Sequence, residues 1–405
     1  MAAGRLESRQ IGPRSSVWAE PDIVEKAAAE FVDTESFIAI GEALTVPYAW
    51  GKYDILVLPG SFPYGGMENP CLTFVTPTLL AGDKSLVNVV AHEIAHSWMG
   101  NLVTPTNWQH FWLNEGFTVF LERKIIGRLQ GEKMRHFKAI LGWEELEKSV
   151  NQYGEGHKFT ALVPDLVGED PDDSFSSVPY EKGFNLLFYL EKVVGGPSVF
   201  EPYIKAHVTK FQNQSITSEQ FREFFVEYFA DQKKKLEVVD WKAWFHAPGL
   251  PPVRPEFDQT LAEACTRLTE KWERTRVAQH QDDLKREEYA SLTPEQKVVF
   301  LAQLGTKEPL PLEAVGKLDS LYNITAETNS EIKYRWHMLA LKANYQPIFT
   351  EVVKFITSQG RMKYIRPLYR SLAVCSRDLA VKTFQSNKAF YHPIAAKQLT
   401  VDLQL

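Results

Sequence analysis

The stretch Val90-Ala91-His92-Glu93-Ile94-Ala95-His96-Ser97-Trp98-Met99-Gly100 places two histidines four residues apart, with a glutamate directly after the first. On a helix, residues i and i+4 share one face, so the rings of His92 and His96 can offer nitrogens to a single point. Two imidazoles at this spacing suit zinc. Glu93 lies about 100° further round the helix, where it can serve as general base for water at the metal. Two histidines of a buried helix can also simply satisfy each other or the backbone.

A third ligand is available downstream, in Trp112-Leu113-Asn114-Glu115-Gly116. Residues 97–114 separate Glu115 from His96, and they hold turn formers and a proline that cannot lie inside a helix. This pattern predicts a helix, a loop and a second helix with Glu115 near its start. Two histidines and one carboxylate are typical of an open, hydrolytic zinc site. We therefore predict one catalytic zinc ion per chain, bound by His92, His96 and Glu115.

Length and composition limit the class of protein. With 405 residues the chain can form two or three domains, and its 44% apolar and 24% charged residues are ordinary for a globular protein. The net charge of −6 argues against a nucleic-acid-binding protein. Three distant cysteines (Cys71, Cys265 and Cys375) are too few for a disulfide framework. No apolar signal-peptide core or membrane-spanning run is visible, so we expect a cytoplasmic monomer.

The first part of the chain contains a glycine pair, Gly65-Gly66, in a segment that could form the edge strand of a sheet. Residues 1–20 are polar and lack periodicity, residues 21–44 have helical spacing, and residues 53–59 are typical of a strand ended by proline. Gly65-Gly66, followed by Met67 and Glu68, leaves a backbone that another backbone can approach closely. A bound peptide could pair with this edge and place its charged terminus at Glu68. An ordinary turn with an exposed carboxylate is the alternative.

A tyrosine follows an acidic loop in the middle of the chain. Helical patterns cover residues 133–150 and 184–194, and the loop 154–177 between them contains Glu169-Asp170-Pro171-Asp172-Asp173. Ser177 and Pro179 are helix-start signals, which places Tyr180 in the first turn of the next helix. A tyrosine there is usually a packing residue. A phenol beside a zinc ion, however, can donate to the oxyanion that forms when water attacks a carbonyl.

The last part of the chain is predicted to be a helical array. Residues 248–255 are rich in proline and predict a stiff linker, which separates a domain at 21–247 from one at 256–405. Gln359-Gly360-Arg361-Met362-Lys363 sets two cations beside a glycine, as a solvated helix start often does. Successive helical segments with short turns predict an α-solenoid, at 256–278, 292–304, 311–322, 328–343, 346–358, 362–374, 376–387 and 391–402.

Gly65-Gly66-Met67-Glu68-Asn69, the two histidines and Glu115 together resemble the motifs of the gluzincin zinc aminopeptidases. Residues 5–14, 64–84, 176–189 and 359–363 are similar to the leukotriene A(4) hydrolase branch of that family. The resemblance implies a mainly α fold: a thermolysin-like catalytic domain with a small mixed sheet, followed by an α-solenoid domain. It also implies a bifunctional enzyme that cleaves short peptides with a free N-terminus and hydrolyses a lipid epoxide acid, leukotriene A(4), to leukotriene B(4).

The resemblance assigns a role to each candidate residue. Zinc would be bound by His92, His96 and Glu115, with Glu93 as the base. In the same scheme Tyr180 would polarise the scissile carbonyl, and Asp172 would direct water to the distal carbon of the epoxide. Substrate-binding roles fall to Gly65, Gly66, Met67, Glu68 (for the α-amine), Arg361 and Lys363 (for the carboxylate).

The sequence departs from the family pattern in two places. Phe175 stands where the family usually has a tyrosine, and it cannot donate a hydrogen bond, so the product geometry of the epoxide reaction could differ. The family also carries an N-terminal β domain, and we interpret residues 1–20 as the remnant of its connection to the catalytic domain. Two alternatives are an arginyl aminopeptidase-like enzyme without lipid activity and a non-catalytic, truncated helical scaffold.

Overall fold

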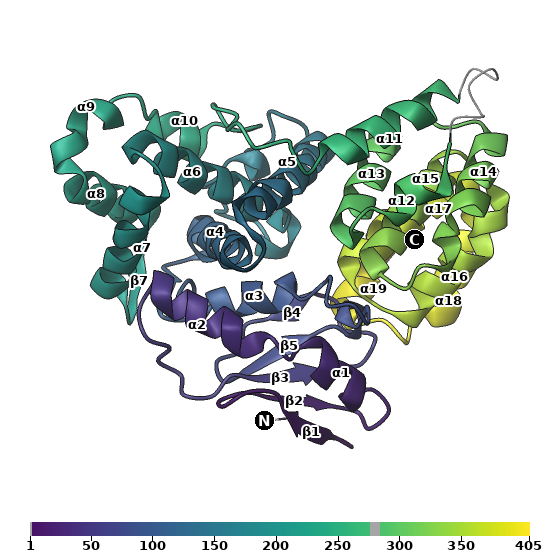
Figure 1. Cartoon of the computed structure of the whole chain (residues 1–405), viewed down its shortest axis with the longest axis horizontal. Helices are drawn as coiled ribbons and strands as arrows, with labels where there is room; N and C mark the ends of the chain where they lie inside the picture. Colours follow the sequence, from purple (N-terminus) through teal and green to yellow (C-terminus); the bar gives the residue numbers. More distant parts are fainter. Residues whose placement is uncertain (1, 276–283) are drawn as a thin grey trace.

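A mixed five-stranded sheet lies at one edge of the first half of the chain (Figure 1). The computed structural model describes residues 2–275 and 284–405. The strand order is β1-β2-β3-β5-β4, with β2, β3 and β5 parallel and β1 and β4 antiparallel to their neighbours. Strand β4 is therefore an edge of the sheet. The strands are β1 (Glu7–Gln10), β2 (Ser16–Ala19), β3 (Asp54–Val57), β4 (Gly66–Met67) and β5 (Leu72–Val75).

Residues 7–19 belong to this sheet, although they show no periodicity in the sequence. Strands β1 and β2 form an antiparallel pair, and β2 continues in parallel onto β3. On β2, Val17 and Ala19 are buried while Trp18 points outward and donates to Asp54 at 3.1 Å. Strands of four residues are too short for this alternation to stand out in the sequence. The stretch interpreted as the remnant of a connection thus contains two strands of the sheet.

Helices cover the sheet and build the rest of the first half. Helix α4 is the central one, because it packs against α3, α5 and α6 and is buried along most of its length. The predicted helical segment 21–44 is interrupted at residues 31–33 and forms α1 and α2. A parallel pair, β6 (Val103–Pro105) and β7 (Gln214–Ile216), lies apart from the main sheet. The helices are α1 (Val24–Glu30), α2 (Thr34–Leu44), α3 (Asn88–Ala95), α4 (Phe111–Gln130), α5 (Glu132–Tyr153), α6 (Val178–Val194), α7 (Pro197–Phe211), α8 (Ser218–Tyr228), α9 (Lys233–Leu236) and α10 (Trp241–His246).

The second half is an all-helical array, drawn in green to yellow in Figure 1. Helix α13 packs against α11 and α15, and α17 packs against α15 and α19, as in stacked helical hairpins. The predicted segments match helices here, with two exceptions: α12 was not predicted, and residues 256–262 of the predicted segment 256–278 precede α11 without being helical, while the end of that segment lies outside the described residues. The helices are α11 (Glu263–Arg274), α12 (Arg286–Ala290), α13 (Pro294–Thr306), α14 (Leu312–Tyr322), α15 (Ser330–Lys342), α16 (Phe349–Ser358), α17 (Met362–Cys375), α18 (Arg377–Asn387) and α19 (Pro393–Asp402).

Two hydrophobic clusters account for most of the buried apolar side chains. One draws on residues from Val17 to Phe245, and the other on residues from Ala262 to Leu403 together with Phe137 of α5. The mainly helical fold with a small mixed sheet agrees with the predicted fold class. Within the described part of the chain, no helix combines the length and the apolar character needed to cross a bilayer.

A buried histidine in the first cluster makes stability depend on pH. His207 of α7 is 1% exposed, stacks on Phe117 and has no partner for Nδ1, and burial lowers its pKa to about 3. In the unfolded chain this side chain takes up a proton below about pH 6.5, whereas in the folded chain it stays neutral. Acid therefore favours unfolding, and this one group should remove about 2 kcal/mol of stability between pH 7 and 5.

Urea unfolding at pH 7 and pH 5 measures this effect. His207→Leu should reduce the difference in unfolding free energy between the two pH values by about 2 kcal/mol. His246→Leu, at an exposed position, is the matched control and should leave the difference unchanged. An equal pH dependence in wild type and His207→Leu would contradict the prediction.

Candidate metal centre and active site

Three potential metal ligands meet between α3 and α4. His92 lies in α3, His96 directly follows its last residue, and Glu115 lies near the start of α4. The Nε2 atoms of the two histidines are 3.2 Å apart, and Oε2 of Glu115 is 3.3 Å from each. The predicted helix–loop–helix arrangement is present, and it brings the three side chains to one point.

The outer nitrogens of both histidines are held by residues of α4 and the adjoining turn. Nδ1 of His92 lies 3.0 Å from Oε2 of Glu122. Nδ1 of His96 lies 2.9 Å from the carbonyl of Met99 and 3.0 Å from Oγ1 of Thr118. Such partners orient the rings so that each Nε2 faces the centre. Sequence reasoning missed these partners, although positions 115, 118 and 122 recur at helical spacing.

The charges at this point fit a divalent cation. Among the described residues, Oε2 of Glu115 is buried and has no hydrogen-bond partner, although it lies 3.3 Å from Nε2 of each histidine. Burial opposes ionisation of Glu115, but His96 and His92 outweigh it and lower its pKa to about 2. Burial likewise opposes protonation of His96, but Glu68 and Glu115 raise its pKa to about 9. The carboxylates thus favour a positive charge at this point. Two imidazoles and one carboxylate are a set of ligands that suits zinc.

Glu93 lies beside the three ligands with one carboxylate oxygen free. It is 4% exposed, and no described residue forms a hydrogen bond with its Oε2. Burial raises its pKa to about 8, in the range where a carboxyl group can accept and return a proton near neutral pH. A Cβ on Gly66 would lie 2.3 Å from Oε1 of Glu93. The second glycine of the pair therefore leaves the space that Glu93 occupies.

Glu68 follows edge strand β4 and lies next to the same centre. Its Oε1 accepts a hydrogen bond from Nδ2 of Asn114 at 3.4 Å and lies 3.8 Å from Nδ1 of His96. Gly100 has φ of +118°, and a Cβ there would lie 1.8 Å from Oδ1 of Asn114, so only glycine fits at this position. The carboxylate is in place to meet a cationic group that enters along β4.

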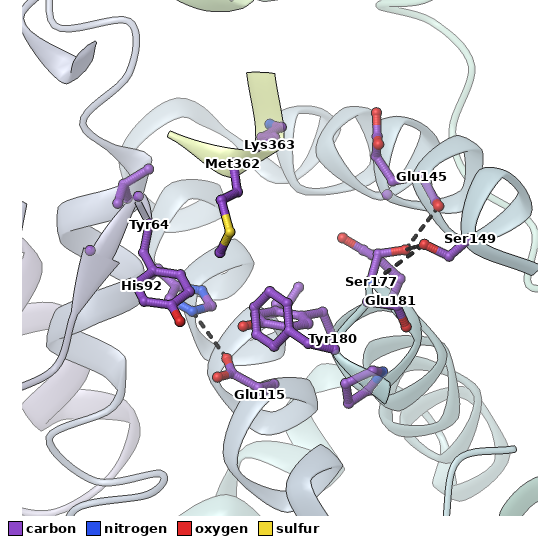
Figure 2. Close-up of a pocket in the computed structure, with 18 of the residues that line it drawn as sticks. Tyr64, His92, Glu115, Glu145, Ser149, Ser177, Tyr180, Glu181, Met362 and Lys363 are labelled. Atoms are coloured by element: carbon purple, nitrogen blue, oxygen red, sulfur yellow. Dashed lines mark hydrogen bonds and ion pairs between the residues drawn. The ribbon is translucent and has the colours of Figure 1, made fainter. Parts of the chain in front are cut away.

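Tyr180 lies in the first turn of α6 and faces the three candidate ligands. Its ring stacks on His92 at 6.1 Å and meets Phe175 edge-on at 6.2 Å. Figure 2 shows Tyr180, His92 and Glu115 around one space. Burial raises the pKa of Tyr180 well above its ordinary value, so the group remains a neutral phenol that can donate a hydrogen bond. Asp172 lies in the acidic loop, and its side chain and that of Tyr180 line one cavity.

A glycine pair brings α4 and α6 into close contact near these groups. A Cβ on Gly116 would lie 2.7 Å from Cα of Gly183, and one on Gly183 would lie 2.8 Å from Cα of Gly116. Gly116 follows Glu115, and Gly183 lies one turn after Tyr180. The close approach of the two helices therefore sets the spacing of Glu115 and Tyr180. No local pattern in the sequence points to this contact.

The centre opens into a cavity of about 810 Å³ that both halves of the chain line. From the helical array, Arg361, Met362 and Lys363 reach its wall, and Figure 2 shows the last two across from Tyr180. Lys363 forms an ion pair with Oε1 of Glu331 at 2.5 Å. Arg361 is 8% exposed, donates to the hydroxyl of Tyr364 at 3.0 Å and leaves Nε without a partner. Arg361 is thus one of two arginines at this wall whose Nε has no partner among the described residues, the other being Arg335 of α15.

Comparisons with known proteins agree with this fold. The profile described as "Peptidase family M1 domain" matches residues 29–244, and "Leukotriene A4 hydrolase, C-terminal" matches residues 292–403. The chain belongs to peptidase family M1. Within that family it is leukotriene A4 hydrolase-like, with 47% identity to the leukotriene A-4 hydrolase of Xenopus laevis over 100% of this chain and 67% of the relative.

Other relatives support the same family assignment. Leucine aminopeptidase 2 of Aspergillus terreus is 44% identical over 100% of this chain and 66% of the relative. The structure of yeast LTA4 hydrolase in complex with bestatin superimposes with a TM-score of 0.95 at 41% identity, covering 99% of this chain and 67% of that one. The chain spans about two thirds of the length of these relatives.

Proposed function

We propose that this chain is a zinc aminopeptidase that removes the N-terminal residue from short peptides. One observation carries the proposal: His92, His96 and Glu115 bring their ligand atoms to one point, and the unpaired carboxylate oxygen of Glu93 lies beside them. Zinc bound by these three residues would supply Lewis-acid polarisation of a carbonyl and activation of water.

The residues around the ligands would perform the remaining steps. Glu93 accepts the proton of the attacking water and returns it to the leaving amine. Tyr180 donates a hydrogen bond to the oxygen on which negative charge develops. These two groups act on the reacting atoms, and their effect depends on placement within about an ångström.

Two anchors would hold the ends of the peptide. Glu68 pairs with the α-ammonium group, which restricts cleavage to the first residue. Arg361 pairs with the substrate carboxylate through a planar fork that suits it, and Lys363 adds positive charge while paired with Glu331. The bestatin complex of the yeast relative and the name of the Aspergillus relative support a peptide substrate.

Hydrolysis of a lipid epoxide is the second activity that we propose. Asp172 lines the same cavity as Tyr180 and Arg361, so water could be directed to a carbon remote from the metal while Arg361 binds the lipid carboxylate. Zinc held by His92, His96 and Glu115 would supply the Lewis-acid chemistry that opening of an allylic epoxide needs. Phe175 contacts both Tyr64 and Tyr180 edge-on but offers no hydrogen bond. The Xenopus relative, named a leukotriene A-4 hydrolase, supports this activity.

Metal removal and two substrates test the proposal together. The full chain with zinc should hold one zinc per chain and release amines from aminoacyl anilides. A chelator should abolish the release, and added zinc should restore it. Leukotriene A(4) should yield a dihydroxy acid under the same conditions. Peptide turnover without dihydroxy acid would favour the arginyl aminopeptidase-like alternative. A folded, zinc-loaded chain that turns over neither substrate would favour the scaffold.

A further inference from the structure

Two loops from the two halves of the chain pair backbone to backbone beside the cavity. The N–H of Gly360 donates to the carbonyl of Gly60 at 2.7 Å, and the N–H of Met362 donates to the carbonyl of Pro63 at 2.8 Å. The two donors are two residues apart and the two acceptors three residues apart, so the contact joins two loops and is not a regular strand pairing. We call this pairing of residues 60–63 with residues 360–362 the latch.

The latch needs glycine at position 360. A Cβ there would lie 2.7 Å from the carbonyl oxygen of Ser61 and 3.0 Å from its carbonyl carbon. All the atoms that it would meet are backbone, so no side-chain rotation relieves the contact. A Cβ on Gly60 would similarly lie 3.0 Å from the carbonyl oxygen of Ser358. The absence of these side chains lets the two backbones reach hydrogen-bond distance.

Arg361 lies between the two latch bonds. Its own N–H donates to Oε1 of Gln359 at 2.8 Å, so the backbone on both sides of its Cα is fixed. Its guanidinium packs on Gly65, where a Cβ would lie 2.6 Å from Nη2. It is 8% exposed, yet its Nε has no partner among the described residues. A buried guanidinium with an unpaired donor at a cavity wall is suited to bind an anion.

The other side of the latch leads directly to the amine anchor. Residues 60–63 run through Gly65 into edge strand β4, and Glu68 follows that strand. The latch therefore ties Arg361, from the helical array, to the same stretch of backbone that carries Glu68. The distance between the two anchors is set by backbone bonds and not only by flexible side chains.

We propose that the latch is a positioning device that makes the enzyme select substrates with a free carboxylate. This inference rests on the proposed function, in which Arg361 binds that carboxylate. Gly360 and the N–H of Met362 touch no substrate and act through Arg361. Because a bidentate clamp depends on orientation, loosening the latch should remove the advantage of carboxylate substrates and leave the chemistry at the metal ligands unchanged.

Met362→Pro removes a single latch bond. Met362 is the first residue of α17, where proline is tolerated because its missing N–H has no partner within the helix. Arg361 has φ of −63° and ψ of 114°, an extended conformation that suits a residue before proline. Met362→Ala also loses the side chain but keeps the N–H, and is the matched control. Gly360→Ala tests the other bond, with Gly305→Ala as control, since a Cβ on Gly305 meets nothing within 4 Å.

Calorimetry with a tripeptide and its C-terminal amide gives the readout, in a Glu93→Gln background that prevents turnover. We expect the free acid to bind about 10–100-fold more tightly than the amide in the parent chain, Met362→Ala and Gly305→Ala. In Met362→Pro and Gly360→Ala the ratio should fall to about threefold or less. An unchanged ratio in Met362→Pro, or equal weakening of both peptides, would overturn the proposal. Failure of the wild-type chain to cleave anilides would instead refute the proposed function, since it does not depend on this ratio.

Discussion

Glu93→Gln should lower the turnover of aminoacyl anilides by about 10²–10⁴-fold and leave zinc binding intact. Glutamine has the size of glutamate and still fits the space beside Gly66, where a Cβ would lie 2.3 Å from Oε1. It cannot accept a proton from water or return one to the leaving amine. The loss should therefore fall on the chemical step, with kcat reduced and KM little changed.

The location of Glu93 explains why the effect should be so large. Its Oε2 is buried without a partner among the described residues, so it is free to take the proton of a water molecule beside the ligands. The other nearby carboxylates that the structure describes are turned toward protein groups. Glu115 and Glu122 face the histidines, and Glu68 contacts Asn114.

Zinc content and turnover distinguish the base from the metal-holding groups. Glu93→Gln should keep one zinc per chain and remain inactive at any zinc concentration. Glu122→Gln is the matched control, since Glu122 orients His92 from outside the ligand set. It should weaken zinc binding by about 10–100-fold and recover turnover at saturating zinc. Full activity in zinc-loaded Glu93→Gln would show that the base is another group.

The convergence of His92, His96 and Glu115 could be predicted from the sequence because its signals are local. His92 and His96 share a helix face by their spacing alone, and Glu115 follows in the next helix after a loop marked by turn formers. The helical array was also predictable, since each of its long helices has its own apolar period. The short helix α12 was missed because five residues, three of them charged, show no such period.

Contacts between distant segments could not be predicted in this way. Gly65 and Gly66 were interpreted as room for a substrate backbone, and the structure adds Arg361 and Glu93 as their direct neighbours. The latch bond joins Gly60 to Gly360 across most of the chain. A glycine in a single sequence indicates freedom of the backbone, but not which atoms occupy the space that its missing side chain leaves.

Gly183→Ala should lower kcat/KM for peptides by about 10²-fold without loss of zinc. The new Cβ would lie 2.8 Å from Cα of Gly116 and 3.3 Å from the ring of Trp112, and ordinary contact would move the helices apart by roughly 1 Å. Tyr180 lies one turn before Gly183 in α6, so its hydroxyl would shift away from Glu115 in α4. Overpacking should also cost about 1–3 kcal/mol of stability. Gly127→Ala, in α4, is the control, because the Cβ there would meet only side-chain atoms.

A double-mutant cycle shows whether Gly183 acts through Tyr180. Tyr180→Phe alone removes the donor to the developing oxyanion and should cost about 10²–10³-fold in kcat. If the close approach of α4 and α6 serves to place that donor, Tyr180→Phe should cost much less in the Gly183→Ala background, because the hydroxyl is already displaced. Additive losses would mean that Gly183 affects the site by another route, such as a shift of Glu115, and reduced zinc content would then accompany them. Non-additive losses with full zinc content would identify the glycine contact as the element that sets the distance between metal ligand and phenol.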